Sequence, residues 1–122
     1  MKLFISADIE GCVGTTLASE THKETPEYRQ FAKRMTDEVR IVCQAALEAG
    51  ADEIVVKDGH GDATNIDFTA MPEGVTLIRG KSGHPYNMMF GLDETFDGVL
   101  YVGYHAPAGN GGNPISHTST GN

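Results

Sequence analysis

The apolar positions of the chain form four short runs and one long periodic segment. The short runs are rich in β-branched and aromatic residues, which is typical of buried strands, and they cover residues 3–7, 53–57, 74–78 and 98–103. Between the first two runs, apolar residues recur at spacings of three and four from Tyr28 to Leu47, and charged residues occupy the other positions. This segment is predicted to form one amphipathic helix.

Residues at both ends of this segment predict where the helix begins and ends. Thr25 is expected to be its N-cap and Pro26 its first residue, with Glu27 in the first turn, where the helix dipole favours an acid. Gly50 is expected to stop it. Shorter helices are predicted at residues 65–70 and 86–92, the latter weakened by a glycine at position 91.

The order strand, helix, strand predicts right-handed βαβ units, and therefore an α/β fold with an open, mostly parallel sheet and helices on both faces. We interpret residues 1–122 as a single α/β domain. Residues 106–122 lack periodicity and are rich in Gly, Asn, Ser and Thr. They form either a low-complexity linker or a glycine-rich active-site loop, and we favour the loop because no closing helix follows.

Composition narrows the class of protein. A length of 122 residues with 39% hydrophobic content suffices for one core without disulfides. The net charge of -8 disfavours binding to nucleic acid or to anionic membranes, both of which require a basic face. Two cysteines form no disulfide framework, and no apolar run approaches the ~20 residues of a membrane span. We expect a soluble, cytoplasmic protein.

The first candidate chemistry follows the first strand. Asp8 and Glu10 are two positions apart, so in an extended chain their carboxylates point to the same side. Two neighbouring carboxylates repel each other, so they require a cation, a shared proton or hydration. A divalent metal satisfies this requirement best, although an acidic turn facing water is the alternative explanation.

Two histidines follow the ends of other predicted strands. His60 comes after the second strand and His105 after the fourth, so both are expected at the sheet edge where parallel α/β folds bind ligands. With Asp8 and Glu10 they supply the carboxylate and imidazole ligands of hydrolytic zinc, for which manganese or cobalt could substitute. A two-metal cluster bridged by Asp8 is conceivable. His117 is then a candidate proton shuttle or stabiliser of a tetrahedral intermediate.

Neighbouring polar side chains have less specific explanations. Asp58 and Asp62 could accept hydrogen bonds from the His60 ring, but hydration of the loop explains them equally well. His22 and His84 follow no strand and are expected on the surface. Cys12 is either a reactive thiol or, more commonly, a small residue in a tight turn.

Together these segments resemble the D-aminopeptidase family, metallopeptidase family M55, of the dipeptide-transport-operon type. The motifs that carry the resemblance occur in the same order over essentially the whole chain: Asp8–Gly11, Asp58–His60, Gly91–Gly98, Gly103–Ala106 and Ser116–Thr118. The resemblance implies a zinc aminopeptidase with two zinc ions, acting on short peptides with an N-terminal D-residue such as D-Ala-D-Ala, and assembling as a homo-oligomeric, decameric ring.

By position, the resemblance implies that Asp8, Glu10, His60 and His105 are zinc ligands and that His117 is the catalytic histidine. Family members are about twice as long as this chain, and a further glutamate ligand lies beyond their Ser-His motif. The resemblance therefore implies either that the chain is the N-terminal part of a longer protein with the family fold, or that it is a short homologue whose metal site lacks one ligand.

Three functions remain open from the sequence. The first is a zinc-dependent aminopeptidase that releases N-terminal D-amino acids from short peptides. The second is an inactive or metal-binding truncated fragment that acts through subunit association. The third is an unrelated metallophosphoesterase, which would use the same ligand types but is not favoured by any basic residue near the motifs.

Overall fold

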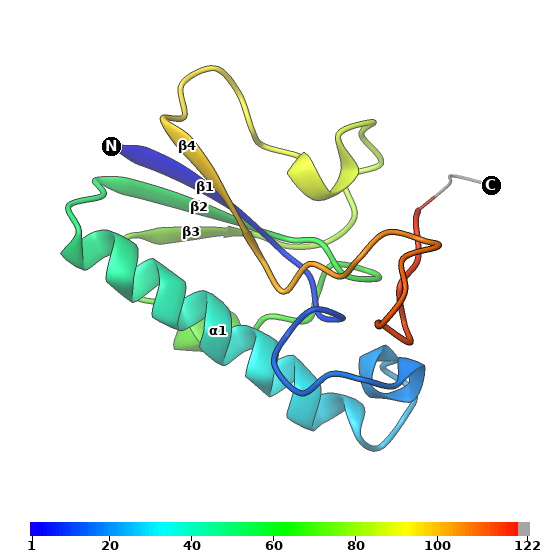
Figure 1. Cartoon of the computed structure of the whole chain (residues 1–122). Coiled ribbons are helices and arrows are strands. Elements are labelled where there is room, and N and C mark those ends of the chain that lie inside the picture. Colours follow the sequence, from blue (N-terminus) through cyan, green and yellow to red (C-terminus); the bar gives the residue numbers. More distant parts are fainter. Residues whose placement is uncertain (120–122) are drawn as a thin grey trace.

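The computed structural model describes residues 1–119 as one parallel sheet, one long helix and connecting loops (Figure 1). The strands lie side by side in the order β3-β2-β1-β4, and all neighbouring pairs are parallel. The expected α/β fold is confirmed. Its elements are β1 (Lys2–Ala7), η1 (Ala18–Thr21), α1 (Tyr28–Glu48), β2 (Glu53–Asp58), η2 (Phe68–Ala70), β3 (Val75–Ile78), η3 (Asn87–Met89) and β4 (Gly98–Val102).

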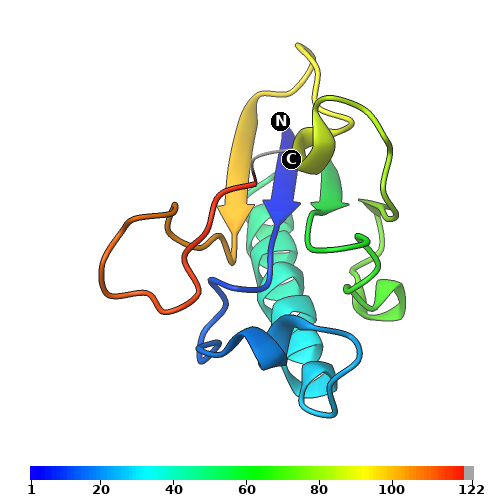
Figure 2. The ribbon, with the colours of Figure 1, turned by 90° about the vertical axis from the view of Figure 1, so that its right-hand side faces the viewer.

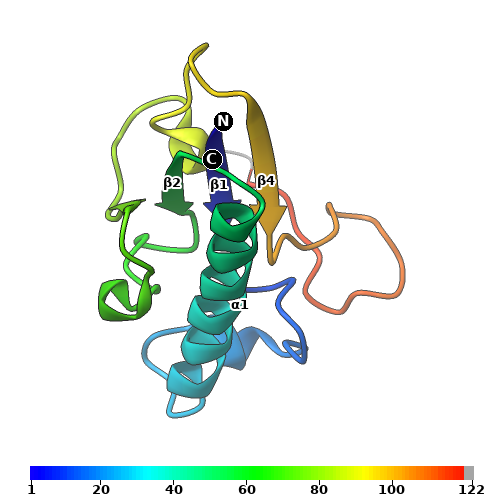
Figure 3. The same ribbon diagram turned by 90° about the vertical axis from the view of Figure 1, so that its left-hand side faces the viewer.

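The helix α1 covers one face of the sheet (Figures 1 and 3). Alternate residues of β1 and β2 point toward it, since side chains of a strand alternate between the two faces. They pack with the apolar stripe of α1 into a single core, whose fully buried members include Ile5, Ile54, Met35, Val39 and Cys43. This packing accounts for the helical periodicity seen in the sequence.

The opposite face is covered mainly by the segment 79–97, which contains η3 (Figure 1). Phe4 is fully buried there and meets Phe96 edge to face, with ring centroids 5.4 Å apart. Ser6 Oγ donates to the carbonyl oxygen of Met88 at 2.8 Å. Among the described residues, α1 is the only α-helix. The second face carries the short 3-10 helix η3, where the sequence predicted a longer helix at residues 86–92.

Helix boundaries differ from the expected ones. α1 begins at Tyr28, with Glu27 rather than Thr25 at the N-cap position. The Thr25 hydroxyl donates instead to the His22 carbonyl at 2.7 Å, so it stabilises the turn that precedes the helix. At the other end Gly50 adopts a φ of 101° immediately after the helix, as expected for a stop. The expected helices at 65–70 and 86–92 shorten to η2 and η3.

Three strands end at the same level of the sheet (Figure 2). Ala7 of β1 is in register with Asp58 of β2 and with Val102 of β4. The chains that follow stay together, because the Gly11 amide donates to the Gly103 carbonyl at 2.7 Å. A Cβ at either glycine would overlap backbone atoms of the other loop, and Gly103 also has a φ of 68°. Only glycine permits this close approach.

The segment 106–119 forms neither helix nor strand, and residues 120–122 of the predicted loop lie outside the described residues. It returns to the side of the sheet edge where β1 and β4 end (Figures 1 and 2). No helix within residues 1–119 combines the length and apolar character that a membrane span requires.

Candidate metal centre

The end of β1 and the end of β2 bring Asp8, Glu10 and His60 together. His60 Nδ1 lies 3.3 Å from Asp8 Oδ1 and 3.2 Å from Glu10 Oε1. Both carboxylates are buried, with exposed fractions of 4% for Asp8 and 8% for Glu10. The three residues each offer a ligand atom within 4.8 Å of the others, so they form a compact donor cluster.

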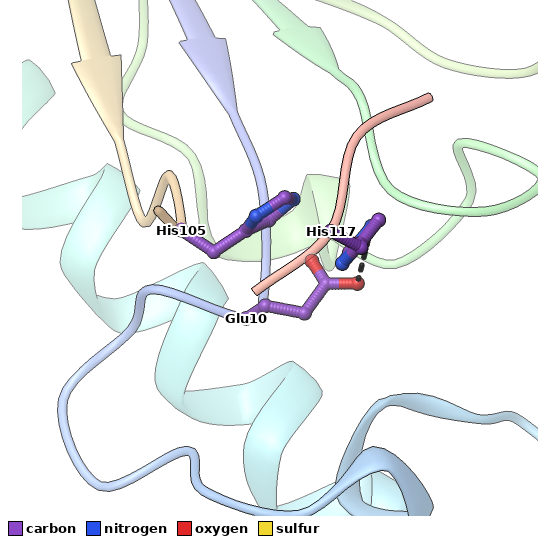
Figure 4. A group of neighbouring side chains, drawn as sticks. All are labelled: Glu10, His105 and His117. Atoms are coloured by element: carbon purple, nitrogen blue, oxygen red, sulfur yellow. Dashed lines mark ion pairs between the residues drawn. The ribbon is translucent and has the colours of Figure 1, made fainter. Parts of the chain in front are cut away.

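A second cluster shares Glu10 with the first and adds two histidines from later in the chain (Figure 4). His105 follows β4, and its Nε2 lies 3.5 Å from Asp8 Oδ2. His117 comes from the segment 106–119, and its Nε2 lies 3.8 Å from Glu10 Oε1. The rings of His105 and His117 stack with centroids 3.8 Å apart. All five residues singled out in the sequence therefore meet at one edge of the sheet.

In each of the three histidines, the ring nitrogen that does not face a carboxylate is hydrogen-bonded to a backbone carbonyl. His60 Nε2 bonds the Thr21 carbonyl at 2.7 Å, His105 Nδ1 the Ala106 carbonyl at 2.8 Å, and His117 Nδ1 the Ile115 carbonyl at 2.9 Å. A carbonyl only accepts, so these nitrogens carry the proton. In the neutral rings the remaining nitrogens present lone pairs to Asp8 and Glu10, an arrangement that a cation between them would make favourable.

The donor atoms also have spacings that suit zinc. Two ligands bound about 2.0–2.1 Å from a tetrahedral ion lie roughly 3.3 Å apart. The carboxylate-to-imidazole distances of the site run from 3.2 to 3.8 Å. Glu10 Oε2 is buried and has no hydrogen-bond partner among the described residues. An unpartnered buried carboxylate oxygen is costly, and a metal ion would satisfy it, so the residues present fit the expected cofactor.

Burial and the closeness of the charged groups shift the pKa values of three residues of the site. Burial raises the pKa of Asp8, His60 opposes the rise, and neighbouring Glu10 adds to it. Burial alone would raise the pKa of Glu10, but its contacts with His60 and Asp8 lower it to about 2. Burial alone would lower the pKa of His60, but Asp8 and Glu10 raise it to about 10. The two carboxylates therefore favour a positive charge between them.

Two aspartates near His60 do not orient its ring, contrary to one of the sequence interpretations. The Asp58 carboxylate is fully buried and accepts hydrogen bonds from the backbone amides of Asn65 and Ile66. Asp62 forms an ion pair with Lys23 at 2.7 Å. Both carboxylates therefore stabilise the loop after β2 rather than the imidazole itself.

Cys12 is the small buried residue of a turn. Its thiol donates to the Asp8 carbonyl at 3.3 Å, and burial together with the nearby Glu38 carboxylate raises the pKa of Cys12 to about 12. Nucleophilic cysteines require a low pKa, so the structure favours a structural role for this residue. His22 and His84 are exposed, as expected.

The five residues line a cavity of about 680 Å³, a volume typical of small-molecule sites. Sequence reasoning assigned no role to several other residues of its wall. Tyr104 directly precedes His105, and this adjacency was the one available signal. The other missed lining residues lie in the segment after β3, which carries no periodic pattern: Lys81, Gly83, Asn87 and Met88. His84, expected only at the surface, lines the cavity too.

The chain is similar to proteins of known activity. A model of the M55 peptidases, D-aminopeptidase, matches residues 1–122. A D-aminopeptidase of Bacillus subtilis strain 168 is 33% identical over 118 residues, covering 97% of this chain and 42% of that protein. Among solved structures, DppA from Bacillus subtilis, a zinc-dependent D-aminopeptidase and self-compartmentalizing protease, matches with TM-score 0.91 and 32% identity. The match covers 97% of this chain and 42% of DppA, so the chain spans less than half the length of these relatives. The resemblance seen in the sequence is confirmed, and the chain belongs to the M55 family of D-aminopeptidases.

Proposed function

We propose that this chain carries the metal centre of a zinc-dependent aminopeptidase that releases N-terminal D-amino acids, such as D-Ala, from short peptides. One observation carries the proposal: two buried carboxylates and three oriented histidines bring their donor atoms together in the wall of a single cavity. Family membership and the zinc-dependent relative support both the metal and the D-configuration of the substrate.

Asp8, Glu10, His60 and His105 would hold the metal. Asp8 suits a bridging position between two ions, because Oδ1 faces His60 and Oδ2 faces His105. Bound zinc would polarise the scissile carbonyl and lower the pKa of an attacking water. The chain itself contributes the fixed orientation of the ligands and the cavity that holds the peptide against them.

His117 is better suited to proton transfer than to metal binding. Its side chain is 53% exposed, whereas those of His60 and His105 are each 14% exposed. Its contact with Glu10, at 3.8 Å, is also the longest of the site. With its Nδ1 proton held by Ile115, Nε2 is free to exchange a proton with a peptide in the cavity. His117 would stabilise the developing charge or protonate the leaving amine.

A second candidate function is subunit association without catalysis, and the observation that favours it is the similarity to the self-compartmentalizing protease DppA. In this alternative the chain binds one metal ion or none by itself and acts through association with further subunits. The proposals differ in zinc content and in turnover, so both quantities are needed to separate them.

The proposed function is tested with the purified chain, zinc and D-Ala-D-Ala, with L-Ala-L-Ala and a phosphate diester as comparison substrates. We expect zinc-dependent release of free D-alanine and no phosphate ester hydrolysis. His117→Ala should abolish release while leaving zinc content unchanged, and His22→Ala, the same change at an exposed histidine, should preserve both. Less than one equivalent of zinc with no release would refute the enzyme proposal and support the fragment alternative.

Self-association is a further part of this proposal. The relative DppA is a self-compartmentalizing protease. In this chain the edge strand β4 exposes apolar side chains, with Leu100 39% and Tyr101 59% exposed. An unpaired apolar edge favours pairing with another chain. We expect a homo-oligomer, checked by the sedimentation mass of the purified chain, and a single species of 13.1 kDa would contradict it.

A further inference from the structure

The cavity that contains the donor cluster has one strong cation in its described wall. Lys81 follows β3 and is the only lysine or arginine among the described residues that line the cavity. The cluster lies at the ends of β1, β2 and β4, so Lys81 approaches the same space from the β3 side of the sheet. A peptide held at the cluster therefore shares its cavity with an ammonium group.

Lys81 also differs from the other lysines of the chain in its contacts. Each of the other four donates a hydrogen bond: Lys2, Lys23, Lys33 and Lys57. Lys81 forms no hydrogen bond or ion pair with any residue between positions 1 and 119, and it is exposed to the cavity. Its charge is thus available to a ligand.

The residue that precedes Lys81 is held by hydrogen bonds to two other segments of the chain. The Gly80 amide donates to the Ala63 carbonyl at 2.6 Å, and the Gly80 carbonyl accepts from Lys57 Nζ at 3.0 Å. Lys57 is 2% exposed, and its ammonium also bonds the Asp58 carbonyl at 2.7 Å. A buried lysine is costly and here ties the start of the Lys81 loop to the end of β2, which carries His60. The start of the Lys81 loop is therefore hydrogen-bonded to the strand end that precedes His60.

We propose that Lys81 binds the free C-terminal carboxylate of the peptide, so that the site selects short peptides with an unblocked carboxyl end. This inference rests on the proposed function. In a dipeptide the carboxylate lies one residue beyond the scissile carbonyl, about 3.8 Å further along the chain, and the flexible lysine stem adapts to it. In a chain of net charge -8, an anionic ligand end requires such a local cation.

The test uses ligands that cannot be cleaved. A ketomethylene analogue of D-Ala-D-Ala, in which CH2 replaces the scissile NH, is prepared as the free acid and as the C-terminal amide. Both are titrated into the full chain with added zinc by calorimetry. The wild type should bind the acid about fivefold more tightly than the amide, the upper range for an exposed ion pair. Lys81→Met, which keeps the stem and removes the charge, should bind both equally, and Lys81→Arg should keep the preference.

A matched control separates this effect from general loss of charge. Lys33→Met, the same change on the exposed face of α1, should keep the fivefold preference. The inference is overturned if the wild type shows no preference, if it binds neither compound, or if Lys81→Met retains the preference. Release of D-alanine is measured separately. Cleavage without preference for the acid would support the proposed aminopeptidase function and refute the Lys81 subsite. A preference that depends on Lys81, without cleavage, would support the subsite and refute the proposed function.

Discussion

At the scale of single residues, Glu10 has a carboxylate that the described residues satisfy only in part. Its Oε1 faces two histidines, His60 and His117, while Oε2 is buried without a partner among the described residues. Desolvating a carboxylate oxygen without a hydrogen bond costs stability. A buried carboxylate oxygen without a partner is more typical of a metal ligand than of a structural acid.

Glu10→Gln tests this interpretation. The amide keeps the shape of the side chain but loses the charge. Changes to residues that only support a metal ligand lower metal affinity by up to about 100-fold, so changing a ligand itself should lower zinc affinity by at least that much. Zinc affinity is measured by competition with a chromogenic chelator. Glu48→Gln, at an exposed position on α1, is the matched control and should bind zinc like the wild type. Equal affinity in the two variants would contradict a ligand role for Glu10.

Gly11 is the second residue on which the geometry depends. Its amide bonds the Gly103 carbonyl, and a Cβ there would overlap the carbonyl of Tyr104, next to His105. Gly11→Ala should destabilise the chain by about 2 kcal/mol, because the displaced neighbour is backbone. Denaturant unfolding measures this loss. Gly111→Ala, where a Cβ meets nothing within 4 Å, should change stability little. A neutral Gly11→Ala would show that the two loops separate readily.

At the scale of elements, a buried network joins α1 to the loop that carries His60. Tyr28 donates to Asn65 Oδ1 at 2.5 Å, and Asn65 Nδ2 donates to Asp58 and to the His60 carbonyl. Asp58 in turn accepts from the backbone of residues 65 and 66. The imidazole is thus positioned through its backbone, by the first turn of the helix and the end of β2.

This network predicts alkaline sensitivity. Burial, with the nearby Asp58 and Asp62 charges, raises the pKa of Tyr28 from 10.0 to about 12. The folded state keeps this proton where the unfolded state loses it, so the stabilisation is complete below pH 10 and is lost between pH 10 and 12. Tyr28→Phe should be less stable by about 1 kcal/mol at neutral pH and should lose less stability over that alkaline window.

Unfolding by urea at pH 7, 10 and 11 measures the difference between wild type and Tyr28→Phe. Both chains share the other groups whose titration affects stability, including the buried thiols of Cys12 and Cys43. Subtracting one curve from the other isolates the tyrosine. A difference that stays constant with pH would show that the Tyr28 hydroxyl titrates normally in the folded chain.

The sequence predicts elements well where one physical rule decides, and less well where local contacts compete. Strand runs and parallel connections sufficed to place Asp8, His60 and His105 at one edge, and the structure brings them there; their roles as ligands stay predictions. Thr25 was expected to cap the helix, but its hydroxyl prefers the His22 carbonyl. The Lys81 and Asn87 wall was missed because that segment is held by side-chain contacts to β1 and β2, which leave no periodic pattern.

At the scale of the whole molecule, the donor cluster draws its residues from four separate parts of the chain. Asp8 and Glu10 follow β1, His60 follows β2, His105 follows β4, and His117 belongs to a segment without helix or strand. An ion bound by all of them is present only in the folded chain. Metal binding should therefore stabilise the entire fold rather than the site alone.

Thermal unfolding with and without zinc tests this coupling. Zinc at 100 times its dissociation constant should stabilise the chain by about 2.7 kcal/mol, which corresponds to a rise in Tm of roughly 10 °C. A chelator should reverse the rise, and magnesium should not replace zinc, because imidazole ligands suit zinc far better. Asp8→Ala should lose the rise, since both its carboxylate oxygens face histidines, whereas His117→Ala should keep most of it. If zinc raised the Tm of Asp8→Ala as much as that of the wild type, its binding site would lie elsewhere.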